Sequence, residues 1–226
     1  TLFPYTTLFR SHSGDFEEIG WMLQQFRAHH HGPIHAVGIS LGGNALMRWA
    51  GEMGHAASEF VQSIASVCSP IDLTASGHAI DRGFNKAVYA RMFLASMKPR
   101  ALDKLQQFPG LFDRNALLAA DTLYAFDDVF TAPLHGFQNA DDYWHRASAK
   151  PGLSAIRVPA LVLNALNDPF VPARSLPDQT DVGDWVQLWQ PKGGGHVGFV
   201  AAPFPGHVKA MPQAVADWLA TGHAET

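Results

Sequence analysis

Residues 38–42 have the types and spacing for nucleophilic chemistry, because they form a Gly-x-Ser-x-Gly pattern with Ser40 at its centre. An apolar run precedes the pattern and a helical pattern follows it, so Ser40 is predicted at a sharp turn from a strand into a helix. Glycine avoids side-chain clashes where such a turn brings backbones together. The N–H of Leu41 would point toward a carbonyl oxygen under attack, as half of an oxyanion hole. The alternative is an ordinary turn serine.

A serine hydroxyl is a weak nucleophile and needs a histidine base, which a carboxylate must orient. His196 lies in the glycine-rich loop 193–198, after a predicted strand at 185–189. Asp168 follows a predicted strand at 160–166 and precedes a proline. Because ligands of open parallel sheets bind at the carboxyl ends of the strands, we expect these side chains to meet Ser40 at that edge. The alternatives are an incidental histidine in a flexible loop and a turn aspartate.

The other candidate groups lack such a context. Residues 29–31 are three adjacent histidines at a predicted helix end, and adjacent side chains point in different directions, which makes a poor metal site. His78, His135 and His145 could contact a substrate, but no pattern singles them out. Cys68 ends a predicted buried strand and is expected to pack. We therefore expect no metal and no organic cofactor.

The elements that must position these residues alternate between helix and strand. Residues 15–30 read as a helix that Ser13 or Asp15 could cap. The later elements are a buried strand at 34–39, a helix at about 42–53, strands at 61–68, 160–166 and 185–189, and a closing helix at 206–220. The apolar stripes are Phe16, Ile19, Leu23 and Phe26 in the first helix, and Val208, Met211, Val215, Trp218 and Leu219 in the last. This order predicts an α/β fold, a mostly parallel sheet with helices on both faces.

Residues from about 72 to 150 break the alternation, because no strand-like run occurs there. Phe84, Val88, Met92 and Phe93 suggest a helix, and several prolines punctuate the segment. We read it as a helical insertion in a single domain that spans residues 12–226. Its apolar side chains would either form a lid over a pocket or pack as an ordinary core.

Composition limits the function classes. The chain has 226 residues, of which 47% are hydrophobic and 16% charged, and a formal net charge of -4. Lys and Arg are not clustered, so no nucleic-acid partner is expected. One cysteine excludes an internal disulfide framework and fits a reducing, cytoplasmic location. No apolar run reaches the roughly 18 residues of a membrane span, so we expect no integral membrane segment. The oligomeric state is left open.

Residues 1–11, TLFPYTTLFRS, read like the translation of a sequencing adapter joined to a gene fragment. The alternative is a natural strand followed by a turn. Under the first interpretation the authentic chain starts near His12, and its N-terminal part, including the early strands of the sheet, is missing.

From about His12 to the C-terminus the chain resembles the YheT-like α/β-hydrolases, bacterial relatives of the eukaryotic ABHD proteins and of yeast medium-chain ester synthases/esterases. FDDVFTAPLHGF is more specific than Gly-x-Ser-x-Gly and separates this family from lipases and thioesterases at large. The matching stretches are HSG at 12–14, VGISLGGN at 37–44, SPIDL at 69–73, DRGF at 81–84, FDDVFTAPLHGF at 126–137, ADDY at 140–143, NALNDPFVP at 164–172 and GGHVGF at 194–199.

The resemblance implies an α/β-hydrolase fold with a helical lid, and it places the family's triad on Ser40, Asp168 and His196. It also implies a carboxylic-ester hydrolase that forms an acyl-enzyme with short- to medium-chain acyl esters or acylglycerols, without cofactors. Some members pass the acyl group to an alcohol, so an acyltransferase is the alternative. Family members carry an earlier glycine-rich loop that supplies a second oxyanion N–H, and no such segment is found here. An inactive fragment or a binding module is therefore a third interpretation.

Overall fold

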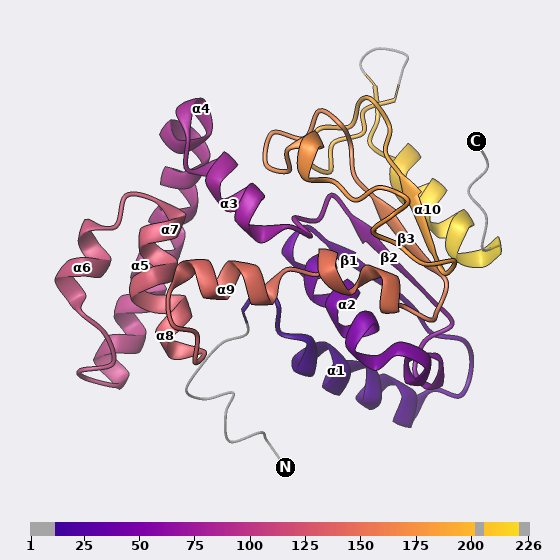
Figure 1. The fold of residues 1–226 in the computed structure, drawn as a ribbon, viewed down its shortest axis with the longest axis horizontal. Coiled ribbons are helices and arrows are strands. Elements are labelled where there is room, and N and C mark those ends of the chain that lie inside the picture. The colour runs from indigo at the N-terminus through magenta and orange to yellow at the C-terminus, as the bar shows by residue number, and fades with distance from the viewer. Residues whose placement is uncertain (1–11, 202–205, 222–226) are drawn as a thin grey trace. The chain divides into compact units, whose positions relative to one another are not determined.

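The computed structural model describes residues 12–201 and 206–221 (Figure 1). The eleven N-terminal residues, for which an adapter origin is predicted, lie outside this part. The chain divides into two compact units. The sheet unit comprises Ser13–Asp72 and Ala147–Thr226, and the helical unit comprises Thr1–His12 and Leu73–Arg146.

The sheet unit is built on parallel strands in the order β1-β2-β3-β4. The strands are β1 (His35–Ile39), β2 (Ser63–Val67), β3 (Ala160–Leu163) and β4 (Val186–Trp189). The registers place Val37 opposite Ala65, Ala65 opposite Leu161, and Leu161 opposite Gln187. Because every pair is parallel, all four strands end at one edge of the sheet. The predicted parallel α/β architecture is confirmed.

Helices cover both faces of this sheet. On one face α1 (Phe16–His29), α2 (Leu41–Met53) and the 3-10 turn η4 (Lys150–Ala155) share a core with Ile64 of β2. On the other face α10 (Ala210–Thr221) packs Val215 and Trp218 against Ala65 and Val67 of β2. Neighbouring strand residues point to opposite faces, which explains why β2 and β3 are buried throughout. A second 3-10 turn, η1 (Gly54–Glu59), joins α2 to β2.

Strand β1 differs from its prediction as a buried strand. It is an edge of the described sheet, and its Val37 and Ile39 side chains are 46% and 52% exposed. Its other face, with Ala36, does pack against the α1 and α2 core. The apolar run therefore predicted the strand correctly, but it did not predict that the strand lies at an edge of the described sheet.

The sequence predicted most features of the first and last helices of the sheet unit. Asp15 caps α1, because its Oδ1 accepts the backbone N–H of Glu18 at 3.0 Å. Leu23 is buried, whereas Phe26, predicted on the same stripe, is 62% exposed. Helix α10 begins at Ala210, so Val208 precedes it and is 58% exposed. In both helices the apolar periodicity predicted the helix correctly, but it did not predict where the packed part of the apolar side ends.

The helical unit contains no strand among its described residues. Its helices are α3 (Leu73–Ile80), α4 (Gly83–Asn85), the π-helix η2 (Lys86–Ala90), α5 (Arg91–Gln107), α6 (Arg114–Ala119), α7 (Leu123–Phe126), the π-helix η3 (Asp127–Thr131), α8 (Ala132–Leu134) and α9 (Ala140–Ala147), whose last residue belongs to the sheet unit. Its own core gathers Leu94, Ala101, Leu117 and Phe126. The helical interpretation of this segment is confirmed, while its role as a lid stays a prediction.

Two carboxylates organise the helical unit. Asp81 accepts the backbone N–H groups of Leu123 and Tyr124 at 2.7 and 2.9 Å, at the start of α7. Asp127 is partly buried, and its carboxylate accepts from the Thr131 hydroxyl and from the Trp144 indole N–H. Burial raises the pKa of Asp127 to about 6, although the two hydrogen bonds oppose this shift.

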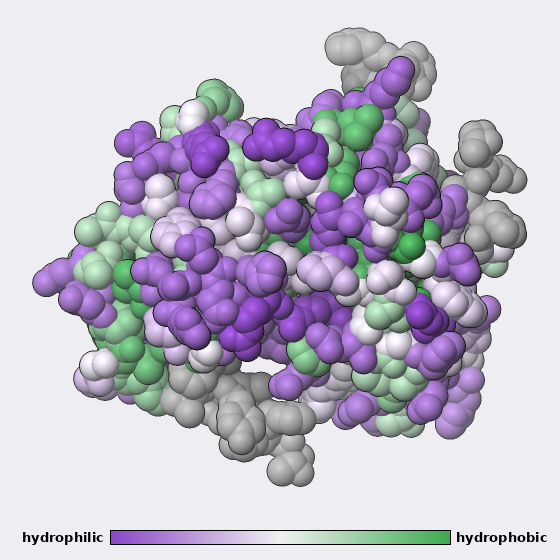
Figure 2. All heavy atoms as spheres, viewed as in Figure 1, coloured by the Kyte–Doolittle hydropathy of each residue, from purple (hydrophilic) through white to green (hydrophobic). Residues whose placement is uncertain are grey.

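Hydrophobic side chains also reach the surface of the helical unit, and Figure 2 shows them over α5 and α6. Phe84, Val88, Met92 and Leu118 are between 41% and 72% exposed. The first three residues predicted a helix, which the structure confirms. The simpler expectation for each apolar side chain was that it would pack in a core, and the structure instead exposes it.

Candidate active site

Ser40 lies between β1 and α2, where the sequence predicted it. Its backbone has φ 52° and ψ -126°, a conformation that non-glycine residues rarely adopt. Its N–H donates to the Val67 carbonyl at 2.9 Å, which extends the β1–β2 ladder by one residue. Its carbonyl accepts from the N–H of Gly43 at 3.0 Å and so starts the helix. The turn is therefore fixed from both sides, and it exposes the hydroxyl at the end of the strand.

Two glycines, Gly38 and Gly43, permit this turn, and only Gly38 belongs to the Gly-x-Ser-x-Gly pattern. A Cβ on Gly38 would lie 2.5 Å from the Gly42 carbonyl oxygen and from the Gly43 Cα. A Cβ on Gly43 would lie 1.9 Å from the Ser69 hydroxyl and 2.7 Å from the Gly38 carbonyl oxygen. In contrast, a Cβ on Gly42 would meet nothing within 4 Å. The steric restriction predicted from the sequence is therefore present at Gly38 and absent at Gly42, and the one at Gly43 was not predicted.

The structure brings the three predicted side chains together. His196 Nε2 lies 3.1 Å from Ser40 Oγ, and His196 Nδ1 lies 2.9 Å from Asp168 Oδ2. The Asp168 side chain is fully buried, whereas the His196 side chain is 20% exposed. The second Asp168 oxygen accepts the backbone N–H of Phe170 at 2.8 Å. The carboxylate thus has a partner on each oxygen and is held in one orientation.

Backbone conformation and backbone hydrogen bonds determine the shape of the loop that carries His196. Gly194 and Gly195 have φ of 153° and 58°, and a Cβ on Gly194 would lie 2.4 Å from the Phe199 ring. The Phe199 N–H donates to the Gly194 carbonyl at 2.8 Å and closes the loop. The Gly195 N–H donates to the Asn167 side chain at 2.8 Å, beside Asp168. This last bond ties the histidine loop directly to the aspartate loop.

Two further residues contact this site, and the sequence did not identify them. The Phe170 ring packs against the His196 imidazole, with centroids 4.6 Å apart. Cys68, expected only to pack, has φ 50° and its thiol lies 3.7 Å from the Gly195 carbonyl oxygen. Burial raises the pKa of the Cys68 thiol, which keeps it protonated. Phe170 follows Asp168 by two positions in the sequence, and this short separation is the signal that could have identified it as a residue of the site.

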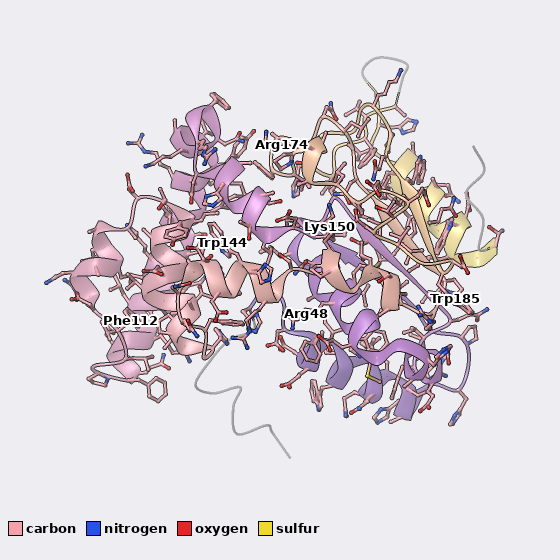
Figure 3. All side chains as sticks on the ribbon, viewed as in Figure 1. Arg48, Phe112, Trp144, Lys150, Arg174 and Trp185 are labelled. Atoms are coloured by element: carbon pink, nitrogen blue, oxygen red, sulfur yellow. The ribbon has the colours of Figure 1, made fainter. Side chains whose placement is uncertain are left out.

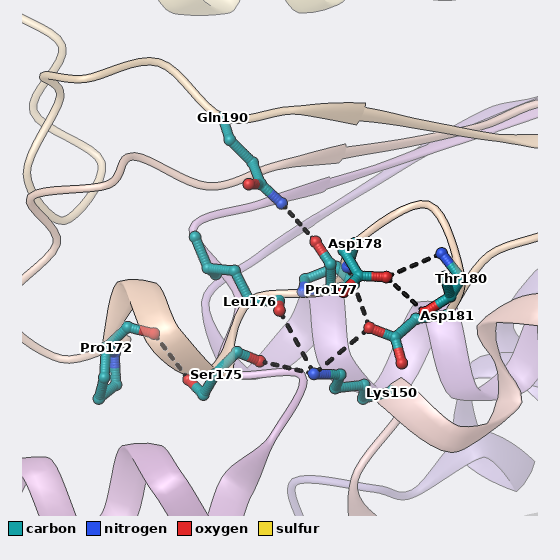
Figure 4. A network of polar contacts seen from close by, with 9 residues as sticks. All are labelled: Lys150, Pro172, Ser175, Leu176, Pro177, Asp178, Thr180, Asp181 and Gln190. Carbon is teal, nitrogen blue, oxygen red and sulfur yellow. Dashed lines mark hydrogen bonds and ion pairs between the residues drawn. The ribbon is translucent and has the colours of Figure 1, made fainter.

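A polar network anchors the segment that follows Asp168 (Figure 4). Lys150, labelled in Figures 3 and 4, donates to the carbonyls of Ser175 and Leu176 at 3.2 and 3.3 Å and pairs with Asp181 at 3.4 Å. Ser175 lies in the short 3-10 turn η5 (Ala173–Ser175). The Gln190 amide, just after β4, donates to the Pro177 carbonyl at 2.7 Å. The segment is therefore held from η4 on one side and from the end of β4 on the other.

Asn44 joins the two sequence segments of the sheet unit, directly beneath the Ser40 turn on α2. It is fully buried, and its Nδ2 donates to the carbonyls of Ser13 and Ala147 at 2.7 and 2.8 Å. Its Oδ1 accepts the N–H of Ala149 at 2.9 Å. On the same helix the Arg48 guanidinium, labelled in Figure 3, lies 5.0 Å from the centroid of the Phe16 ring. Helix α2 therefore has fixed partners along its length.

The remaining candidates occupy other places. Leu41 is the first residue of α2, and within residues 12–201 and 206–221 its N–H takes no acceptor, as is usual for a first helical turn. His78 stacks on Tyr124 and contacts Trp144 inside the helical unit. His29 contacts the Gln25 carbonyl at the end of α1. Among the described residues no group of three or more His, Cys, Asp or Glu side chains could hold a metal ion. None of the helices in the described ranges is long and apolar enough to cross a membrane.

Comparison with known proteins agrees with this architecture. Residues 6–203 match the family described as the alpha/beta hydrolase fold. The candidate esterase YheT of Escherichia coli K12 is 33% identical over 213 residues, which cover 93% of this chain and 62% of YheT. Human phospholipase ABHD3 is 26% identical over 174 residues, or 76% of this chain and 42% of ABHD3. The monoacylglycerol lipase of Saccharomyces cerevisiae is 28% identical over 174 residues, or 74% and 38% of the two chains.

The chain thus spans less than two thirds of the length of these relatives. The family match, in contrast, covers most of the chain, including all four strands and the loops that carry the three side chains. The resemblance noted from the sequence motifs is confirmed. This chain belongs to the α/β-hydrolase fold family.

Proposed function

We propose that this chain carries the acyl-transfer site of a serine ester hydrolase, with Ser40 as nucleophile, His196 as general base and acid, and Asp168 as the group that orients His196. The observation that carries the proposal is the continuous hydrogen-bond series from Ser40 Oγ to the Asp168 carboxylate, at 3.1 and 2.9 Å. A buried carboxylate on Nδ1 favours the tautomer whose Nε2 is free to accept the serine proton.

In the proposed reaction His196 Nε2 takes the Ser40 proton while Oγ bonds to the carbonyl carbon of the ester. The Leu41 N–H donates to the oxyanion that forms. The oxyanion collapses, the bond to the alcohol oxygen breaks, and Nε2–H protonates the leaving alcohol. Water then attacks the acyl-serine with His196 as base, and the carboxylic acid leaves while Ser40 regains its proton.

The substrate class proposed is short- to medium-chain acyl esters or acylglycerols. It is favoured by the names of the relatives, which describe an esterase, a phospholipase and a monoacylglycerol lipase. The same groups could pass the acyl chain to an alcohol in place of water, so the assay below includes ethanol as a competing acceptor.

The test is covalent labelling of the chain by a fluorophosphonate, together with hydrolysis of p-nitrophenyl butyrate. Ser40→Ala should abolish labelling, and His196→Ala should slow hydrolysis by on the order of 10⁴-fold or more. Ser58→Ala and His55→Ala are matched controls at exposed positions and should behave like wild type. Ethyl butyrate formed in the presence of ethanol would identify the acyltransferase.

A folded chain that never labels would refute the proposal and favour a binding module. Undiminished labelling of Ser40→Ala would place the nucleophile elsewhere.

A further inference from the structure

Helices α4, η2 and α5 form one uninterrupted helical run over residues 83–107, and one side of this run is apolar yet exposed. Phe84, Val88 and Met92 are spaced by four residues on successive turns, and they are 72%, 41% and 55% exposed. We call these three side chains the apolar stripe. Another side of the same run carries Ala90 and Leu94, which are buried. The stripe is therefore a second apolar side of the helix, and not part of the core of its unit.

The same run is strongly basic. Between residues 82 and 104 the sequence contains six basic residues and one acidic residue, Asp103, which gives a net charge of +5. The whole chain has a net charge of -4, so the rest of the chain carries -4 - 5 = -9. The six basic residues are Arg82, Lys86, Arg91, Lys98, Arg100 and Lys104. Lys and Arg are therefore clustered in this segment, contrary to the expectation from composition.

A hollow of about 620 Å³ lies beside the run and is lined by three of these cations. Lys86 pairs with Asp121 at 2.7 Å, and Lys98 donates to the Leu118 carbonyl at 2.8 Å. The lining also includes Arg91, which is exposed and whose guanidinium makes no hydrogen bond or ion pair with any described residue. With one carboxylate among three cations the hollow keeps a net charge of +2, beside the apolar side chains of Leu94 and Leu118.

We propose that this face of the helical unit docks on the surface of a lipid bilayer that contains anionic phospholipids. The apolar stripe enters the boundary between headgroups and acyl chains, and the flanking cations contact lipid phosphates, with Arg91 at the hollow. An exposed apolar stripe beside clustered Lys and Arg is the pattern of a helix that lies in a membrane interface. A nucleic acid would use the cations but not the stripe.

The distribution of charge along the sequence also favours an anionic bilayer as the partner of this face. The rest of the chain carries a net charge of -9, which an anionic bilayer repels as a whole, so the basic run would orient the molecule. The proposal does not depend on the ester hydrolase function, because it uses none of the residues assigned to that site.

The test is co-sedimentation of the full chain with vesicles of phosphatidylcholine alone or with 30% phosphatidylglycerol, at 50 and 500 mM salt. Binding should require the anionic lipid and should weaken at high salt, where the Debye length falls to about 4 Å. Arg91→Gln should weaken apparent affinity about fivefold, the effect expected of one charge near the surface. Phe84→Ser should weaken it by roughly tenfold, since the ring leaves water on binding.

Matched controls come from the sheet unit. Phe26 is 62% exposed and Arg174 is exposed, so Phe26→Ser and Arg174→Gln remove the same groups from another surface and should leave binding unchanged. Circular dichroism of each variant checks the fold, and fluorophosphonate labelling reports separately on Ser40.

Equal binding to both vesicle types, no binding to either, or equal losses in the control variants would overturn the proposal. A dimer in analytical ultracentrifugation that Phe84→Ser dissociates, without vesicle binding, would overturn it and assign the stripe to contact between copies of the chain.

Discussion

Substitution of Gly43 by alanine should damage the Ser40 turn, while the same substitution at Gly42 should not. The two glycines are neighbours in the first turn of α2, so the change in helix propensity is the same. Only the space around the new methyl group differs. At Gly43 it would lie 1.9 Å from the Ser69 hydroxyl, 2.7 Å from the Ser66 hydroxyl and 2.7 Å from the Gly38 carbonyl oxygen. At Gly42 it would meet no heavy atom within 4 Å.

The magnitudes follow from these contacts. Alanine in a helix is about 0.5–1 kcal/mol more favourable than glycine, so Gly42→Ala should stabilise the chain by up to that amount. Gly43→Ala has the same gain but forces the Ser69 rotamer and the β1 backbone to move, and overpacking of this kind costs about 1–3 kcal/mol. Because the propensity gain is the same in both variants and cancels, the expected difference in free energy of unfolding between them is about 1–3 kcal/mol, with Gly43→Ala the less stable.

Urea unfolding followed by tryptophan fluorescence measures this difference, and the rate of fluorophosphonate labelling reports on Ser40. Gly43→Ala should label more slowly than wild type, because α2 and the Ser40 turn must shift together. Gly42→Ala should label at the wild-type rate. Two variants of equal stability and equal labelling rate would show that the close approach of β1 and α2 is not what fixes the turn.

Two other residues make separate predictions. Asn44→Ala removes three hydrogen bonds to buried backbone groups and should cost about 3–5 kcal/mol in urea unfolding, and a loss below about 1 kcal/mol would contradict this role. Asp127 has a pKa of about 6 in the folded state against 3.8 for an ordinary aspartate, so the unfolded chain releases its proton first as pH rises. Its contribution therefore destabilises the helical unit progressively from about pH 4 to pH 6, by roughly 3 kcal/mol in total. Asp127→Asn can keep both contacts, by donating to Thr131 and accepting from Trp144, and unfolding measured from pH 4 to 8 should show its advantage over wild type growing within this window. A difference that does not change with pH would refute it.

What the sequence predicted correctly was local. A Gly-x-Ser-x-Gly pattern between an apolar run and a helical pattern predicts the Ser40 turn, because the strand, the turn and the helix are consecutive in the sequence. The carboxyl ends of β3 and β4 were also readable, and they placed Asp168 and His196 at the edge where the structure brings them within hydrogen-bond distance of each other.

What the sequence could not supply depends on neighbours that are distant along the chain. Val37 reads as a core residue in any apolar run, and its exposure follows only from the position of β1 at the edge of the described sheet. Gly42 and Gly43 are equivalent in sequence and differ because Ser66 and Ser69 approach only one of them. The contact of Phe170 with His196 likewise depends on how two loops fold over the sheet.

Two residues with strained backbone conformations lie at the edge of the sheet where the strands end and where the three candidate catalytic side chains meet. Ser40 and Cys68 are non-glycine residues with φ of 52° and 50°, and each follows the end of a strand directly. Such conformations cost on the order of 1–3 kcal/mol each and persist only where the surroundings determine them. Here the N–H of Ser40 is held by Val67 at 2.9 Å and the N–H of Cys68 by Leu163 at 2.7 Å, so the sheet ladder itself continues into both residues.

The ladder therefore opposes relaxation of the two turns, because relaxing either one would break a hydrogen bond of a buried strand. Cys68 in turn contacts the Gly195 carbonyl with its thiol, directly before His196. The hydroxyl of Ser40 and the loop of His196 are thus positioned from adjacent strands of one rigid sheet. Preorganisation of this kind, fixed before any substrate binds, is what acyl transfer at Ser40 would require.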